Sequence, residues 1–241
     1  MSDVIISKVN ECDLYIDAEP HILREISDHF SFEVEGKSFI PSVRKKYWDG
    51  VCRLFSLTTQ RFPCGLIYRL CKWLDKHDYT WEFQNNKFYG VPYDTNPKVF
   101  MEGVELFCNK ISHFTPRKYQ VETVYQVLKE YRKTVVSPTG SGKSFMIYAV
   151  SRYNKSIGNR TLIVVPTKSL VEQMYKDFKD YGWDVEENCH RIYQGHSLSS
   201  NKPVIISTYQ SIYGLDKKWY RQFDCVIGDE CHQFNSPVLL G

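Results

Sequence analysis

The chain has 241 residues, of which 42% are hydrophobic and 15% aromatic, which is enough for the cores of one or two domains. Its net charge of +3 is close to neutral, no apolar run approaches the roughly 20 residues of a membrane span, and the N-terminus lacks the pattern of a secretory signal. We therefore expect no membrane partner. The eight cysteines include no Cys-x-x-Cys pair, which favours free thiols in a reducing cytoplasm over a zinc site or a disulfide framework.

The spacing of apolar residues in the segment 1–85 predicts a small α+β domain. Alternating apolar residues indicate strands, and apolar residues spaced by three and four indicate helices. We expect strands at 4–9, 12–17, 32–34, 51–55 and 79–83, and helices at 20–30 and 66–77.

Charge is distributed unevenly in this first domain. Residues 11–35 hold eight acids against one arginine, whereas residues 37–72 hold eight basic residues against one acid. Basic residues interleaved with Tyr47 and Trp48 suit a nucleic-acid surface, with cations for phosphates and rings for sugars or stacking. The alternative is a solvated basic loop whose aromatic residues belong to the core. The candidate nucleic-acid contacts here are Arg44, Lys45, Lys46, Trp48 and Arg53.

The sequence pattern changes after residue 85. The segment 86–112 includes Pro92 and Pro97 and has few periodic features, which predicts a linker with one short helix at 99–109. From residue 113 to 241 strands alternate with helices, which is typical of a parallel sheet. We expect helices at 119–132 and 169–181, and strands at 134–136, 161–165, 204–208 and 224–228.

The segment Ser137–Ser144 reads Ser-Pro-Thr-Gly-Ser-Gly-Lys-Ser between the expected strand and an apolar helix. This is the context of a phosphate-binding loop, although Ser137 replaces the first glycine of the general pattern. Gly140 and Gly142 allow backbone N–H groups to turn toward a polyphosphate. Lys143 can reach the β- and γ-phosphates, and the Ser144 hydroxyl can bind Mg²⁺. Taken alone, an ordinary glycine-rich turn remains the alternative.

Two acids follow the last buried strand. Asp229 and Glu230 come directly after residues 224–228, 85 residues after Ser144, and His232 lies two positions further on. Opposite a phosphate loop, Asp229 can hold Mg²⁺ and Glu230 can orient and deprotonate water. The alternative is a pair of acids that only ends a surface strand.

In this order the elements resemble the first motor domain of a superfamily 2 helicase. Thr139–Ser144 is similar to motif I, Asp229–His232 to motif II of the DEAD/DEAH type and Val165–Gln173 to motif Ia. Ser207–Ser211 resembles a DNA-contacting motif, and Arg117–Gln120 an element in which glutamine reads adenine. The resemblance implies a RecA-like P-loop NTPase fold: an α/β domain with a parallel sheet and flanking helices.

The first domain resembles the front module of the UvsW-type recombination helicases of T-even bacteriophages. The similar segments are Phe30–Gly36, Tyr47–Gly50 and Arg53–Phe55. The resemblance implies an ATP-dependent DNA helicase or translocase that acts on branched DNA in recombination, repair or replication, in the host cytoplasm. Its cofactors would be ATP and Mg²⁺.

The resemblance also implies residue roles. Lys143, Asp229, Glu230 and His232 would be catalytic, and Ser144 and Asp229 would bind the metal. The nucleotide would contact Arg117, Gln120, Thr139, Gly140, Ser141, Gly142, Lys143 and Ser144. The DNA-tracking face would hold Pro166, Thr167, Lys168, Thr208 and Gln210.

The chain ends at Gly241, nine residues after His232, before the Ser-Ala-Thr motif and the second motor domain that the family's pattern adds. We therefore expect the 241 residues alone to bind ATP weakly, to turn it over little and not to unwind DNA. Three alternatives remain at this point. They are a translocase of a restriction or nuclease complex, a non-catalytic DNA-binding module with a vestigial nucleotide site, and an RNA helicase. The oligomeric state is not indicated by the sequence.

Overall fold

A computed structural model describes residues 2–10, 12–84, 89, 98–130 and 132–235. The chain divides into two compact units, residues 1–95 with 130–132 and residues 96–129 with 133–241, and each is described by itself. No helix in the described part of the chain is long and apolar enough to cross a membrane. All eight cysteines are free thiols.

The first unit is built on a four-stranded sheet of order β5-β2-β1-β6. The central strand β1 (Val4–Lys8) pairs antiparallel with β2 (Asp13–Ala18) and parallel with β6 (Trp81–Phe83). The edge strand β5 (Arg61–Pro63) pairs antiparallel with β2. The strands predicted at 4–9, 12–17 and 79–83 are confirmed, but β5 was not predicted.

Two helices cover one face of this sheet. They are α1 (Pro20–His29) and α3 (Ile67–Lys76), and both were predicted. Their apolar residues share one core with Val4 and Ile6, which point to the same face because side chains alternate along a strand. Proline in the first turn of α1 lies where no backbone N–H is needed.

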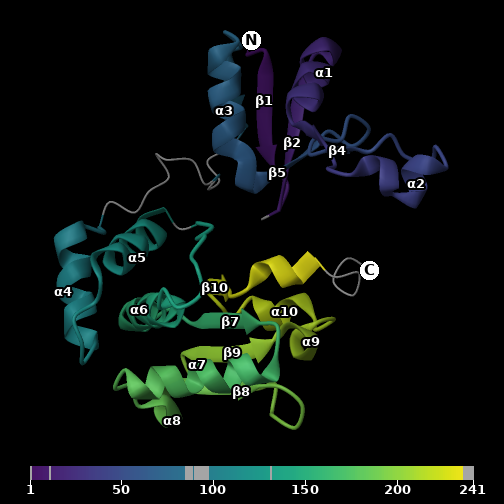
Figure 1. The fold of residues 1–241 in the computed structure, drawn as a ribbon. Helices are drawn as coiled ribbons and strands as arrows, with labels where there is room; N and C mark the ends of the chain where they lie inside the picture. The colour runs from purple at the N-terminus through teal and green to yellow at the C-terminus, as the bar shows by residue number, and fades with distance from the viewer. Residues whose placement is uncertain (1, 11, 85–88, 90–97, 131, 236–241) are drawn as a thin grey trace. The chain divides into compact units, whose positions relative to one another are not determined.

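A small two-stranded ribbon extends the first unit. Strand β3 (Ser31–Glu33) pairs antiparallel with β4 (Val51–Arg53). Between them lie the 3₁₀ helix η1 (Lys37–Phe39) and the single-turn helix α2 (Pro41–Arg44), as Figure 1 shows. The basic segment predicted to bind nucleic acid lies in this connection, here called the β3–β4 arm (residues 31–53).

The second unit contains a parallel sheet of order β10-β7-β9-β8 (Figure 1). Strands β7 (Thr161–Val165) and β9 (Val204–Thr208) lie in the centre, and they have the predicted bounds. The predicted strand at 224–228 is β10 (Cys225–Gly228), and the unpredicted β8 (Cys189–Ile192) forms the other edge. The α/β class and the parallel sheet are confirmed.

Helices cover both faces of this sheet. The predicted helices α6 (Lys143–Ser156) and α7 (Lys168–Asp180) share a core with Ile163 and Val165 of β7. Leu162, on the opposite face, packs with Ile212. The remaining helices are α4 (Met101–Ile111), α5 (Lys118–Glu130), α8 (Val185–Asn188), α9 (Tyr209–Ile212), α10 (Lys217–Tyr220) and η3 (Cys231–Asn235).

The helix expected inside the linker is α4, and it is not an isolated helix. Val104, Cys108 and Ile111 are buried in the core of the second unit. The rest of the expected linker, from residue 86 to 97, lies outside the described residues except for Tyr89.

One predicted strand is wrong. Residues 134–136 form no strand, although they are apolar and β-branched. Val136 is 96% exposed, and Val226 on the edge strand β10 is 64% exposed. A strand is stabilised by ladder hydrogen bonds and cross-strand packing, and in the described part of the chain this segment pairs with no strand.

Candidate nucleotide and nucleic-acid sites

The phosphate loop leads directly into helix α6, which begins at Lys143 with Gly142 as its N-cap. Gly140 and Gly142 both adopt left-handed φ angles, 79° and 78°. A Cβ on Gly142 would lie 2.3 Å from the Gln120 Nε2 atom, so a side chain at this position would force Gln120 to move. The loop therefore requires glycine both for its backbone conformation and for its close approach to α5.

Helix α5 is hydrogen-bonded to the phosphate loop at the Ser141 carbonyl. The buried Gln120 side chain donates from Nε2 to the Ser141 carbonyl oxygen at 3.0 Å and accepts from the Arg117 backbone N–H at 2.9 Å. The Tyr119 hydroxyl donates to the same carbonyl at 2.6 Å and accepts from Arg117 Nη1 at 3.2 Å. Gln120 thus contacts the loop and Arg117 is bonded to Gln120 and Tyr119, while the contacts of Arg117 and Gln120 with a nucleotide stay a prediction. Tyr119 was not named as a site residue, although it lies within the Arg117–Gln120 segment, because the resemblance of that segment points to the arginine and the glutamine.

The two ends of the predicted catalytic site meet at one ion pair. Lys143 Nζ donates to Glu230 Oε1 at 2.7 Å, across 87 positions of sequence, and each side chain is less than a third exposed. Hydrogen bonding to Lys143 lowers the pKa of Glu230, and the same bond raises the pKa of Lys143. His232 Nδ1 lies 3.4 Å from the second oxygen of Glu230.

The acidic pair is placed by the end of β10. The Asp229 backbone N–H donates to the Val164 carbonyl at 2.9 Å, which extends the β7–β10 ladder by one residue. Glu230 then adopts φ = 51°, a left-handed angle that is uncommon outside glycine, and its N–H donates to Asp229 Oδ1 at 3.0 Å. Burial raises the pKa of Asp229. Carboxylate oxygens are ligands that Mg²⁺ prefers, which suits the Asp229 carboxylate, whereas Glu230 is engaged by Lys143.

The other predicted metal ligand is engaged elsewhere. The Ser144 hydroxyl lies 2.9 Å from the Tyr181 hydroxyl, beside an aromatic cluster with Phe114, Phe145 and Tyr148. Among the hydrogen bonds of the described residues, none joins Ser144 to Asp229. The structure thus brings Lys143, Asp229 and Glu230 together but leaves Ser144 on another partner.

The residues of the expected DNA-tracking face lie at the C-terminal ends of β7 and β9. These strands are neighbours, with Val165 in register with Thr208. Thr167 caps α7 by accepting from the Leu170 N–H at 3.3 Å, and the Lys168 ammonium lies 4.9 Å from the centre of the Tyr193 ring. The remaining predicted residues differ in exposure: Pro166 and Thr208 are buried, and Gln210 is exposed.

The β3–β4 arm divides its predicted contacts into two groups. Arg44, Lys45 and Lys46 are exposed. Trp48 is half-buried and donates from Nε1 to the Val51 carbonyl at 3.1 Å. Arg53 forms an ion pair of 2.7 Å with Asp49, whose pKa is lowered by that hydrogen bond. Trp48 and Arg53 therefore hold the arm together.

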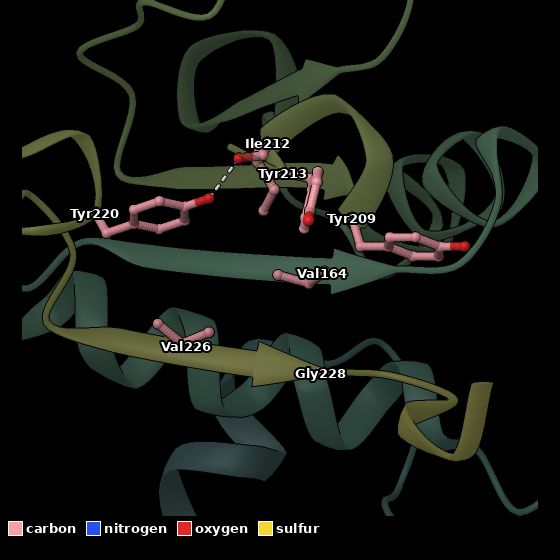
Figure 2. A pocket seen from close by; sticks show the side chains of 7 residues that line it. All are labelled: Val164, Tyr209, Ile212, Tyr213, Tyr220, Val226 and Gly228. Atoms are coloured by element: carbon pink, nitrogen blue, oxygen red, sulfur yellow. Dashed lines mark hydrogen bonds between the residues drawn. The ribbon is translucent and has the colours of Figure 1, made fainter. Parts of the chain in front are cut away.

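A cavity of about 410 Å³, whose lining includes no residue of the phosphate loop, lies on the face of the sheet that carries Val164 and Val226 (Figure 2). The Tyr220 hydroxyl donates to the Ile212 carbonyl at its rim. The complete lining is Val164, Tyr209, Ile212, Tyr213, Tyr220, Val226 and Gly228. No charged side chain is among these residues, so the cavity does not suit a triphosphate.

Comparisons with known proteins agree with this arrangement. Residues 113–238 match the family described as "Type III restriction enzyme, res subunit", and residues 4–84 match "DNA helicase UvsW, N-terminal". The chain is 31% identical over 228 residues to "ATP-dependent DNA helicase uvsW" of Enterobacteria phage T4, covering 90% of this chain and 44% of that protein. It is 33% identical over 137 residues to "DNA 3'-5' translocase XPB2" of Sulfurisphaera tokodaii, covering 52% of this chain and 29% of that protein.

A solved structure is similar over both units. The crystal structure of the UvsW helicase from bacteriophage T4 matches with a TM-score of 0.76 and 27% identity, covering 95% of this chain and 83% of that chain. The chain spans less than half the length of the curated relatives named above. Because one family match covers more than half of the chain and the other covers most of the rest, the chain belongs to the superfamily 2 helicases, as a relative of the UvsW type.

Proposed function

We propose that this chain is the N-terminal module and first motor domain of an ATP-dependent DNA helicase or translocase. Its substrates would be branched DNA intermediates of recombination, repair or replication, in the cytoplasm of a host cell. The observation that carries the proposal is the 2.7 Å ion pair between Lys143 and Glu230, which joins a phosphate loop to an acidic pair. The name of the T4 relative, an ATP-dependent DNA helicase, supports the same activity.

In this proposal the loop binds the triphosphate. The backbone N–H groups of Thr139–Gly142 cradle the phosphates, and Lys143 moves from Glu230 to the β- and γ-phosphate oxygens. Asp229 and Ser144 would hold Mg²⁺, which neutralises phosphate charge when bound, and Ser144 would first leave Tyr181. Arg117 and Gln120 would reach the base from their place beside the loop.

Glu230 would then act as the general base. It accepts a proton from a water molecule whose oxygen forms a bond to the γ-phosphorus, while the bond from that phosphorus to the β–γ bridging oxygen breaks. His232, 3.4 Å from Glu230, would connect the nucleotide site to the DNA-tracking face. Within residues 1–241, Lys143 is the cation that pairs with Glu230. We propose that residues 1–241 alone bind nucleotide but hydrolyse it slowly, because further cations are needed to stabilise the charge of the transition state. The arginines of a second motor domain would complete the site, at a gain of about 10³–10⁵ in rate.

DNA would contact both units. We propose residues 1–85 as a DNA-binding domain that uses Arg44, Lys45 and Lys46, residues 86–112 as a linker, and residues 113–241 as the motor domain. Polar residues and helix ends at strand termini, such as Thr167 and Lys168, donate to phosphates without reading sequence.

A binding experiment with one variant tests the proposal. Lys143→Ala should strongly weaken binding of a fluorescent ATP analogue with Mg²⁺ and leave duplex DNA binding unchanged, because the two sites use different residues. Absence of nucleotide binding in the unaltered chain would favour the DNA-binding module with a vestigial nucleotide site.

Two further candidates each have one observation in their favour. The family matched by residues 113–238 is named for a restriction enzyme subunit, which favours a translocase of a restriction complex. A probable RNA helicase of Dictyostelium discoideum, ddx52, is 27% identical over 135 residues, covering 48% of this chain and 20% of that protein. Competition between duplex DNA and duplex RNA of one sequence would separate the RNA alternative, because only RNA presents 2′-hydroxyls.

A further inference from the structure

Two aromatic side chains on the β3–β4 arm are almost fully exposed. Phe39 is 81% exposed and Tyr47 is 82% exposed, whereas the neighbouring Trp48 is half-buried and hydrogen-bonded to Val51. Large apolar rings are usually placed in a core or an interface, because their transfer out of water is favourable. Among the described residues, neither ring belongs to the hydrophobic core of the first unit, so both are open to a ligand.

The backbone around Tyr47 holds the ring outward. Helix α2 ends at Arg44, and Lys46 then adopts φ = 60°, a left-handed angle that glycine normally supplies. The N–H groups of Tyr47 and Trp48 both donate to the Ser42 carbonyl, at 2.9 and 3.3 Å. A lysine in this conformation is strained by about 1 kcal/mol or more, and such strain tends to occur at functional sites.

The charge of the arm specifies the ligand. Residues 36–48 contain four basic residues and no acid. Lys37 is paired with Glu33 at 2.6 Å, which leaves Arg44, Lys45 and Lys46 exposed beside Tyr47. Protein interfaces are depleted of lysine at their core, whereas cations that alternate with rings are the pattern of single-strand nucleic-acid binding.

We propose that Phe39 and Tyr47 stack on unpaired bases, so that the arm binds single-stranded nucleotides at a branch point. The faces of bases inside a duplex are already stacked, so exposed rings find a partner only where the strand is open. The three cations would bind the adjoining phosphates. This inference rests on the proposed DNA-binding function and adds the single-stranded part of the substrate.

The test compares ring and charge variants on two substrates. Stacking on one base contributes about 1–3 kcal/mol, so Tyr47→Ala should weaken binding of a single-stranded oligonucleotide about five- to 150-fold. Duplex affinity and the salt slope should not change, and Phe39→Ala should behave alike. Tyr47→Phe keeps the ring and should bind as the unaltered chain does. Tyr68→Ala is the matched control, since that ring is 43% exposed on α3.

A 2-aminopurine base in the single strand reports the stacking directly. Its fluorescence should be quenched by the unaltered chain and by Tyr47→Phe, but not by Tyr47→Leu, which is apolar without a ring. Equal losses on duplex and single strand, or no loss on either, would overturn the inference while DNA binding itself stands. A change in sedimentation for Tyr47→Ala with unchanged DNA binding would assign the rings to a second copy of the chain, and would also overturn it. If the unaltered chain bound neither substrate, the proposed DNA-binding function itself would fail.

Discussion

The pairing of Lys143 with Glu230 makes a quantitative prediction for nucleotide binding. The Lys143 ammonium must leave Glu230 before it can contact phosphate, so the 2.7 Å ion pair opposes binding. Glu230→Gln removes the charge and keeps the shape. A partly exposed ion pair contributes about 0.2–1 kcal/mol, which corresponds to an affinity about 1.4- to fivefold higher in the variant.

The assay is a fluorescence titration with a non-hydrolysable ATP analogue and Mg²⁺, which separates affinity from turnover. The control is a double-mutant cycle with Lys143→Ala. In the Lys143→Ala background, Glu230→Gln should raise the affinity less, because the ion pair is already absent and only the repulsion between carboxylate and phosphate is relieved. Lower affinity in Glu230→Gln alone, or the same gain in both backgrounds, would refute the idea that the pair competes with phosphate.

Three other predictions concern stability. Gly142→Ala should destabilise the chain by about 1–3 kcal/mol in thermal unfolding, because its left-handed φ and the 2.3 Å approach to Gln120 both oppose a side chain. A loss below about 0.5 kcal/mol would contradict this, because ordinary surface substitutions already have effects of that size. Leu70→Ala should cost about 2–5 kcal/mol in chemical denaturation, since Leu70 is fully buried, and a near-neutral result would contradict that packing. Hydrogen bonding, first to Tyr193, lowers the pKa of Glu172 below its ordinary 4.5. The stabilisation is therefore present above pH 4.5 and is lost as pH falls through the lowered value. The unfolding temperature of the unaltered chain should exceed that of Glu172→Gln near neutral pH and approach it in acid, and a constant difference would contradict the argument.

The sheet of the second unit was largely predictable because its central strands are buried on both faces. Residues 161–165 are a continuous run of apolar or β-branched residues, residues 204–208 are such a run apart from Ser207, and their bounds match β7 and β9. Strand β8 was not predictable from such a run, since it reads Cys-His-Arg-Ile and lies at an edge. Residues 134–136 have the composition of a strand but no ladder partner, and composition alone cannot supply one.

The candidate site was predictable where chemistry is local and not where it depends on tertiary contacts. The phosphate loop and the acids of Asp229–Glu230 were identified from their order, and the end of β10 brings Glu230 to Lys143 at the start of α6. The contact of the Tyr119 hydroxyl with the loop, and that of the Tyr181 hydroxyl with Ser144, were not predicted, although Tyr119 lies within the Arg117–Gln120 segment. Their roles follow from packing, which a single sequence does not encode in a readable pattern.

The cations of the β3–β4 arm differ from one another in one respect that can be measured. Arg53 has an acidic partner at 2.7 Å, whereas Arg44, Lys45 and Lys46 form no ion pair among the described residues. Each phosphate neutralised on duplex DNA contributes about −0.9 to the slope of log affinity against log salt, so three free cations predict a contribution of about −2.7. Lys45→Ala removes one phosphate contact, so it should reduce the magnitude of the salt slope by ~0.9. Arg53→Ala should leave the salt slope nearly unchanged, because the charge of Arg53 is already neutralised by Asp49. The variant loses only the ion pair that stabilises the arm. An equal change of slope in both variants would mean that Arg53 leaves Asp49 to bind DNA, and the assignment of Arg53 to the structure of the arm would then be wrong.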